Sequence, residues 1–353
     1  SVSATSYGNP EPASIIRVYT SAPFVLDYAE ETVDYMMCLS SQWKEGVRSI
    51  RERINPDELY WETESIAADN RISQECTHLF TSLDKVHLVK VCGEVRTTVV
   101  KDVPGSGSSS DTENVIARTR GYIDAHLRNP DAVDELLSRA AHYLLNTARD
   151  AEGAIHLYQL AGRYADVIQE IVNQLGIVLV PPHKDRAFWK STATSFYDTF
   201  IRKGLSPVVL ILQKSEQIHL AKTLGDILNL CSFIDLFTEG QFQEALMVLD
   251  SIELLPQKKE DVSRFASRLP SLHPALRKVT NDILMNAMEC TRRLYAQRKN
   301  DRISEYQGQT NTDVTMLYLR NRAQAIVSFS ISTSSYLRQD TPQRLSQIES
   351  TMF

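Results

Sequence analysis

The amino-acid sequence predicts an all-α protein, an irregular solenoid of antiparallel helix pairs with about 15 helices and no sheet. Apolar residues recur at helical spacing over most of the chain, and glycines and prolines stand at the ends of these stripes and not within them. Alternating runs of β-branched residues are few. The best strand candidates, 177–180 and 207–211, are short and stand beside predicted helix ends.

The strongest periodic signal predicts a helix that starts at Tyr164. Its apolar residues are spaced at i, i+3, i+4, i+7, i+8 and i+11: Tyr164, Val167, Ile168, Ile171, Val172 and Leu175. Residues 151–161 form another helical pattern just before it, and Gly162 can adopt the left-handed conformation that a tight helix end needs. The two helices are therefore expected to form an antiparallel hairpin.

A second hairpin is predicted around Gly240. The helix at 216–238 is apolar on more than one side, which is typical of a helix packed between neighbouring layers, and 242–252 follows before Pro256. Further on, 276–294 predicts a long helix ending near Tyr295, and 314–336 predicts another. Three helix starts place a capping side chain before a proline: Asn55-Pro56, Asn129-Pro130 and Thr341-Pro342.

These patterns divide the chain into five parts. Residues 1–102 are helical, 103–111 form a flexible Gly/Ser-rich loop, and 112–298 form the solenoid of helical hairpins. Residues 299–313 are polar and without periodicity, which predicts a loop, and 314–353 supply the C-terminal helices of the same solenoid. The fixed period of a tetratricopeptide array is absent.

Composition limits the classes of function. The formal charge of −6 argues against a general binder of the nucleic-acid backbone. Five scattered cysteines without short paired spacing predict a reducing compartment and no disulfides. No apolar run reaches the roughly 20 residues that span a bilayer, and no secretory pattern opens the chain. The missing initiator Met suggests a piece of a longer protein.

No motif predicts a cofactor or metal site. Gly105 and Gly107 lack the preceding strand and the Gly-Lys-Ser/Thr ending of a phosphate loop. A possible zinc set lies within one short stretch: Cys76, His78, His87 and Cys92. Its second pair is spaced by five residues, whereas structural zinc sites favour two to four, so that scattered core cysteines and surface histidines are the favoured interpretation.

No catalytic residues are predicted either. No Gly-x-Ser-x-Gly elbow or activated Cys signature occurs, and His142 and His156 lie in amphipathic helical patterns. Four carboxylates are spaced along one face of a predicted helix, which indicates a face exposed to solvent and not acid–base catalysis: Asp27, Glu30, Glu31 and Asp34. One stretch of the chain is rich in basic residues: Arg292, Arg293, Arg298, Lys299 and Arg302, with Arg320 and Arg322 further on. A solvated helix end is the favoured interpretation, and the alternative is a binding patch for nucleic acid or an acidic partner. Partner-binding residues stay unassigned.

Three segments resemble the nucleoporin-interacting-component family, the nucleoporin ninety-three class of inner-ring scaffolds. They are 152–161 with 166–173, then Phe233-Ile234-Asp235 through Gly240 to Ala245 with Leu254-Leu255-Pro256, and the terminal Leu319 to Ala323 with Asp340 to Met352. The resemblance is clearest from about residue 111 onward, whereas 1–103 match loosely. The N-terminal segments of the family, which recruit partners, have no counterpart here.

This resemblance implies a bent, coatomer-like α-solenoid without an active site, cofactor or metal. It further implies a structural scaffold of the inner ring at the nuclear pore complex, in the nuclear envelope, supporting transport of protein and mRNA between nucleus and cytoplasm. The implied partners are other nucleoporins, namely a membrane-tethering linker nucleoporin and large inner-ring scaffolds. Neither a small-molecule substrate nor direct contact with nucleic acid is implied, and contact with the membrane would run through partners.

Two other classes fit the same helix pairs. A vesicle-coat scaffold would contain the same helical hairpins, and only the amino-acid sequence of 340–352 favours the nucleoporin family over it. A helical-toroid enzyme would need clustered acids or histidines on inward helix ends, for example around His142 and His156.

Overall fold

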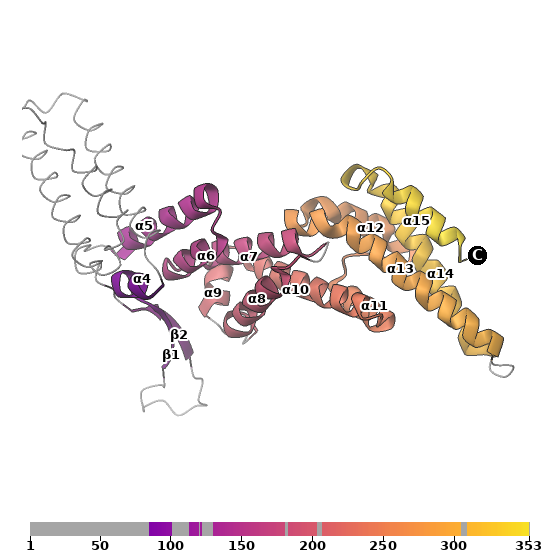
Figure 1. Ribbon diagram of the computed structural model, residues 1–353, viewed down its shortest axis with the longest axis horizontal. Coiled ribbons are helices and arrows are strands. Elements are labelled where there is room, and N and C mark those ends of the chain that lie inside the picture. Colours follow the sequence, from indigo (N-terminus) through magenta and orange to yellow (C-terminus); the bar gives the residue numbers. More distant parts are fainter. Residues whose placement is uncertain are drawn as a thin grey trace, which may run out of the picture. The chain divides into compact units, whose positions relative to one another are not determined.

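The computed structural model describes residues 85–100, 113–119, 121, 130–180, 183–202, 207–304 and 309–352, with the side chains of 85–88, 96–100, 113–117, 130–132, 301–304 and 309–313 left aside. The α-helices of these ranges run from α4 to α15 (Figure 1). The chain divides into two compact units, one of residues 1–167 with 205–211, the other of residues 168–204 with 212–353. The all-α class is confirmed.

The first unit contains one feature that the sequence analysis missed. After α4 (Lys85–Cys92), β1 (Val95–Val100) pairs antiparallel with β2 (Glu113–Arg118), with Val95 opposite Arg118. The prediction of no sheet is therefore wrong by one two-stranded ribbon. Five of the six residues of β1 are Val or Thr, whose branched side chains favour extended backbone. The predicted loop at 103–111, which joins the strands, lies outside the described residues, as does Asn55-Pro56.

One helix of the first unit begins at a predicted capping signal, and a second has a cap that was not predicted. α5 (Pro130–Tyr143) starts at the proline after Asn129 and ends in a π-helical turn, Leu144–Ala148. Asp150 caps α6 (Ala151–Leu160), since its carboxylate accepts a hydrogen bond from the backbone N–H of Gly153. α5 packs against α6. Because α7 (Tyr164–Val178) belongs to the second unit from Ile168 onward, the pairing of 151–161 with it stays a prediction.

In the second unit the predicted hairpin around Gly240 is confirmed. α10 (Ile218–Thr238) packs along α11 (Phe242–Ile252), and it also contacts α8 (Arg186–Phe200) and α13 (Pro274–Ser304). This helix is therefore central, as its apolar surface on several sides predicts. The strand candidates at 177–180 and 207–211 are wholly or partly helical, in α7 and in α9 (Pro207–Lys214).

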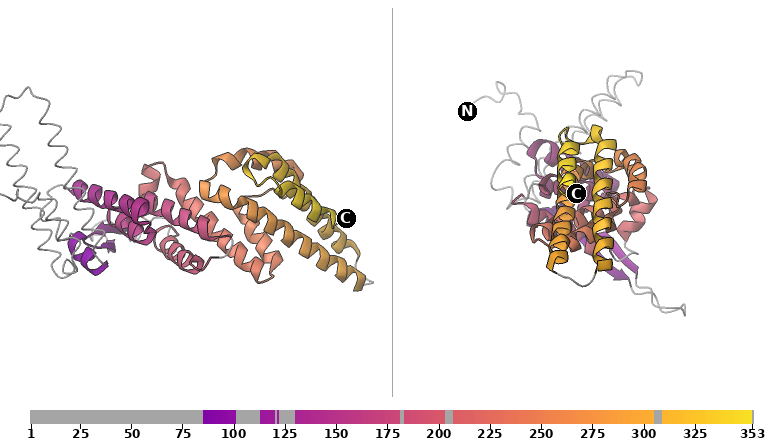
Figure 2. Two further views of the ribbon diagram at one scale, coloured as in Figure 1. Left: turned by 45° about the horizontal axis from the view of Figure 1, so that its top comes forward. Right: turned by 90° about the vertical axis from the view of Figure 1, so that its right-hand side faces the viewer.

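The C-terminal half of the second unit is built on two long helices. α13 and α14 (Gln309–Ser332) lie side by side, as Figure 2 shows, and α15 (Thr341–Ser350) packs on both. α12 (Val262–Arg268) contacts α14, and short 3₁₀ turns stand at Lys259–Asp261, Leu269–Ser271 and Ser334–Tyr336. α15 begins at Thr341 beside the predicted proline, but the predicted capping by Thr341 is wrong, because Asp340 is the N-cap residue and no side chain caps the helix.

The predicted loop at 299–313 is largely helical. α13 continues beyond Tyr295 to Ser304 and α14 begins at Gln309, which leaves 305–308 outside the described residues. Ala296, Gln297 and Arg298 have high helix propensity. They are exposed, so these turns can be helical without the apolar periodicity on which the prediction depended.

The two glycine turns are predicted to resist branched side chains. Gly162 and Gly240 have φ of +67° and +79°, and an added Cβ would meet nothing within 4 Å, so the cost of substitution lies in the backbone alone. We expect Gly162→Val and Gly240→Val each to lower the free energy of unfolding by about 1 kcal/mol or more. Thermal melting measures this. Gly240→Asn is the control, because Asn tolerates the left-handed region, and equal melting of the Val and Asn variants would contradict the expectation.

Candidate partner-binding surface

The residues considered for metal or nucleotide binding do not form a site in the described part of the chain. Cys76, His78, Gly105 and Gly107 lie outside it, while Cys92 is fully buried at the end of α4. No group of three or more His, Cys, Asp or Glu residues there could hold a metal ion. Within the same residues, no helix has the length and apolar character needed to cross a bilayer.

The candidate catalytic groups have ordinary surroundings. His156 is half-buried on α6, as expected of a histidine in an amphipathic helix, whereas His142 is exposed on α5. The acidic face from Asp27 to Asp34 lies outside the described residues. Burial raises the pKa of the Cys290 thiol to about 12 and also raises that of Cys231, so neither thiol is ionised near neutral pH.

The basic run does not form one patch. Arg292 and Arg293 both donate to the carboxylate of Glu289, one helical turn earlier on α13. Arg320 lies over the ring of Tyr295, with the guanidinium carbon 5.3 Å from the ring centroid.

Arg322, two residues further along α14, has only 1% of its side chain exposed and pairs with Asp250 of α11 at 2.7 Å. Several of these cations therefore hold the scaffold together. Arg298 and Lys299 are exposed near the end of α13, whereas the side chain of Arg302 is not described.

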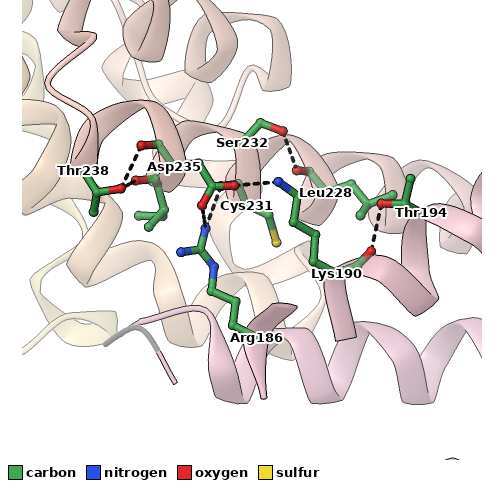
Figure 3. Close-up of polar contacts among 9 residues, drawn as sticks. Arg186, Lys190, Thr194, Leu228, Cys231, Ser232, Asp235 and Thr238 are labelled. Carbon is green, nitrogen blue, oxygen red and sulfur yellow. Dashed lines mark hydrogen bonds and ion pairs between the residues drawn. The ribbon is translucent and has the colours of Figure 1, made fainter. Parts of the chain in front are cut away.

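A polar cluster fastens α8 to α10. Arg186 donates to the carboxylate of Asp235 at 2.7 Å and to the backbone carbonyl of Cys231 at 2.7 Å, and Lys190 reaches the second oxygen of the same carboxylate. Figure 3 shows both cations pointing from α8 toward Asp235. Asp235 belongs to the Phe233-Ile234-Asp235 segment. Its carboxylate thus fixes the spacing of two helices, and the cluster is structural.

A second polar cluster holds α15 in place. The side-chain oxygen of Asn281 in α13 accepts from the Thr341 hydroxyl and from the Arg338 backbone N–H. Arg338 also pairs with Asp282 at 3.3 Å. These contacts join residues 56 to 60 positions apart, which no local pattern could reveal. They hold α15 and the turn before it against α13.

Exposed apolar side chains are the remaining candidates for binding. In the second unit the large ones are Ile177, Phe188, Ile218, Met247, Val314, Leu317, Tyr318, Ile331 and Tyr336. Val314, Leu317 and Tyr318 gather within little more than one turn of α14. The opposite face of this helix holds the buried Met316 and Leu319. The sequence contained the signal, since apolar residues occupy both faces of 314–319, but a partner-binding surface cannot be told from a buried one by this pattern alone.

One carboxyl group in this unit should make the free energy of unfolding depend on pH. Burial raises the pKa of Asp226 to about 6, with Glu253 adding to the rise and the nearby Lys222 and Arg268 opposing it. The folded state therefore holds this proton more tightly than the unfolded state. This contribution to stability is present below about pH 4 and is lost as the pH rises through about 6.

We expect Asp226→Asn to raise the free energy of unfolding at pH 7.5 by about 1 kcal/mol, a value reduced because the group is only half-buried. The gain should vanish near pH 4. Urea unfolding at both values measures it, with Asp198→Asn on the surface of α8 as the control for loss of a carboxylate. A gain that is the same at both pH values would contradict the assignment.

The profile of the Nup93/Nic96 family matches residues 107–344, two thirds of the chain. The chain belongs to the Nup93/Nic96 family. The matched range contains the first two segments that carried the resemblance and, of the third, Leu319 to Ala323 and 340–344, whereas 345–352 lie beyond it.

Curated relatives of this Nup93/Nic96 chain are distant in sequence. Nuclear pore complex protein Nup93-1 of Drosophila melanogaster is 23% identical over 59% of the chain, and nuclear pore complex protein Nup93 of Danio rerio is 22% identical over 64%. The matches cover 25% and 28% of those proteins, so the chain spans about a quarter of the length of the relatives it matches.

A solved structure supports the α-solenoid fold of this chain. The crystal structure of Chaetomium thermophilum Nic96 SOL superposes with a TM-score of 0.62 at 15% identity, over 95% of this chain and 46% of that one. At this identity the likeness establishes the α-solenoid fold alone.

Proposed function

We propose that this chain is a structural scaffold of the inner ring of the nuclear pore complex. Membership of the Nup93/Nic96 family carries the proposal, supported by relatives named as nuclear pore complex proteins and by the solenoid fold. Its role is structural and not enzymatic, and it supports nucleocytoplasmic transport of protein and mRNA by keeping the pore assembled. It resides in the nuclear envelope, and its membrane association runs through partners.

The proposed partners are other nucleoporins, namely a membrane-tethering linker nucleoporin and large inner-ring scaffolds. Long-range ion pairs such as those of Asp235 and Arg322 give the second unit a fixed surface. A fixed apolar surface can receive an amphipathic segment that orders on binding.

Crosslinking mass spectrometry on assembled pores tests the scaffold role. We expect crosslinks from this chain to other nucleoporins, together with a tagged chain at the nuclear rim. Crosslinks to coat subunits on vesicles would support the vesicle-coat alternative and reject the nucleoporin.

A peptide titration tests the mode of binding. Short segments of the membrane-tethering nucleoporin are titrated against this chain at low and high salt. We expect binding to survive high salt and to be lost when apolar peptide anchors become Ala, because a few apolar contacts carry most of the affinity.

Binding abolished by salt would point to charged residues of the surface, such as the exposed Lys299, instead. No binding at all would place the partner surface outside this chain.

A further inference from the structure

A half-buried histidine stands where α7 meets the first turn of α13, within the second unit. The Nε2 atom of His273 lies 2.6 Å from the side-chain amide of Gln169 in α7, 104 positions away. On the same face of α7, two turns further on, a Cβ added to Gly176 would lie 2.8 Å from the Cβ of Ala275. We name these four residues the α7–α13 joint.

The same imidazole caps α13. The backbone carbonyl of His273 accepts from the N–H of Arg277, and its Nδ1 accepts from the N–H of Ala275 at 3.2 Å, so His273 is the N-cap residue before Pro274. A backbone N–H can only donate, so Nδ1 holds a lone pair and the proton of the neutral ring is on Nε2. Nε2–H then donates to the Gln169 amide, turned so that its oxygen faces the ring.

Both bonds of the ring require its neutral form. A protonated imidazole has an N–H on each nitrogen, so an Nδ1–H would face the N–H of Ala275 and the cap would be lost. The charge would also lie at the N-terminus of α13, where the helix dipole disfavours a cation. Protonation of His273 therefore works against the contact that joins the start of α13 to α7.

The groups that face His273 oppose the charged ring from more than one helix. Burial lowers the pKa of this imidazole most, and His219 of α10 and Arg277 of α13 lower it further. The Nε of Arg277 is buried without an acceptor in the described part of the chain. On α7, the carboxylate of Glu170 accepts from two side chains of its own helix. The closed joint thus holds His273 neutral.

We propose that His273 is a pH-sensitive contact, which fastens α7 to α13 when neutral and releases the first turn of α13 when protonated. Since α10 and α11 also pack on α13, the helix stays in the fold while the joint opens. The proposal does not depend on the scaffold function.

The direction of the pH effect follows from the lowered pKa. The closed joint has its full stability above about pH 6.5, the ordinary pKa of histidine. Each pH unit below this value shifts the equilibrium toward the open joint by up to about tenfold, until the pKa of the closed form is reached. Asp226 acts in the opposite direction, because its protonation stabilises the fold, so it cannot cause this loss.

Hydrogen exchange of the full chain at pH 7.5 and 5.5 tests the proposal, with rates divided by the intrinsic exchange rate at each pH. The N–H groups of Ala275 and Arg277 report on the joint, because both donate to His273. We expect their protection to fall several-fold, up to about tenfold, at pH 5.5. Equal protection at the two pH values overturns the proposal.

Matched variants identify the titrating group. His273→Asn keeps a capping oxygen that does not titrate, so the difference between the two pH values should vanish. His219→Asn should retain most of it. A difference that persists in His273→Asn, or that is lost in His219→Asn alone, would assign the effect to another group and overturn the proposal.

A third variant tests the contact itself. Gly176→Val forces α7 away from Ala275 without adding a titratable group, so protection of the first turn of α13 should fall at both pH values. Protection equal to that of the unaltered chain would mean that α7 does not hold this turn, and the proposal would fail.

Discussion

Replacing Ile171 with alanine should lower the free energy of unfolding by about 2 to 5 kcal/mol, the usual range for a core isoleucine. Ile171 has no exposed surface, and neither do Val167, Ile168, Val172 and Leu175, its neighbours in the predicted stripe. The substitution removes three carbon atoms from a site where closely packed neighbours can relax only in part. The cost therefore combines lost transfer energy with that of the cavity.

The same helix contains its own control. Ile177 is exposed on α7, and Ile177→Ala changes side chain and propensity in the same way without opening a cavity. Unfolding of both variants by denaturant, fitted with the same slope of free energy against denaturant concentration, measures the difference between their free energies of unfolding. A loss below about 1 kcal/mol at Ile171 would mean that this face of α7 is solvated, and the helix would then become a candidate for partner binding.

The helical stripes and turns were predictable because they are local. Six apolar residues at helical spacing define α7, and every member that the sequence analysis assigned to the stripe is buried. Gly162 and Gly240 have positive φ, as expected for glycines at helix ends. The same local reasoning failed at β1, where a run of Val and Thr too short to show clear alternation pairs with residues beyond a long polar stretch.

The surface could not be predicted because its chemistry depends on distant partners. Arg320 and Arg322 stand two residues apart in one basic run, yet Arg320 lies on Tyr295 whereas Arg322 is buried against Asp250, 72 positions away. From sequence both are solvated cations. Equally, the exposure of Leu317 beside the buried Met316 follows from which face of α14 meets α13 and α12, a choice made by tertiary packing.

Asp250→Ala should be the most damaging polar substitution considered for this chain, lowering the free energy of unfolding by about 3 kcal/mol. Arg322 stays charged in the folded protein: burial lowers its pKa, but the hydrogen bond and charge of Asp250, with Tyr318, more than offset this and raise the pKa. Without the carboxylate, a guanidinium with 1% of its surface exposed loses the group that compensates its charge. We take the low end of the usual range because Asp250 is partly exposed, which lets water reach the site.

The pair of Asp282 with Arg338 provides the matched control, because it also joins an aspartate to a distant arginine but leaves the arginine 64% exposed. Asp282→Ala should cost less than about 1 kcal/mol. Adding Arg322→Met to Asp250→Ala should restore part of the loss, since removing both charges leaves neither uncompensated. If Asp250→Ala and Asp282→Ala cost the same, Arg322 must turn into solvent when its partner is lost. The pair would then not fix the position of α11 against Arg322 of α14 in the folded protein.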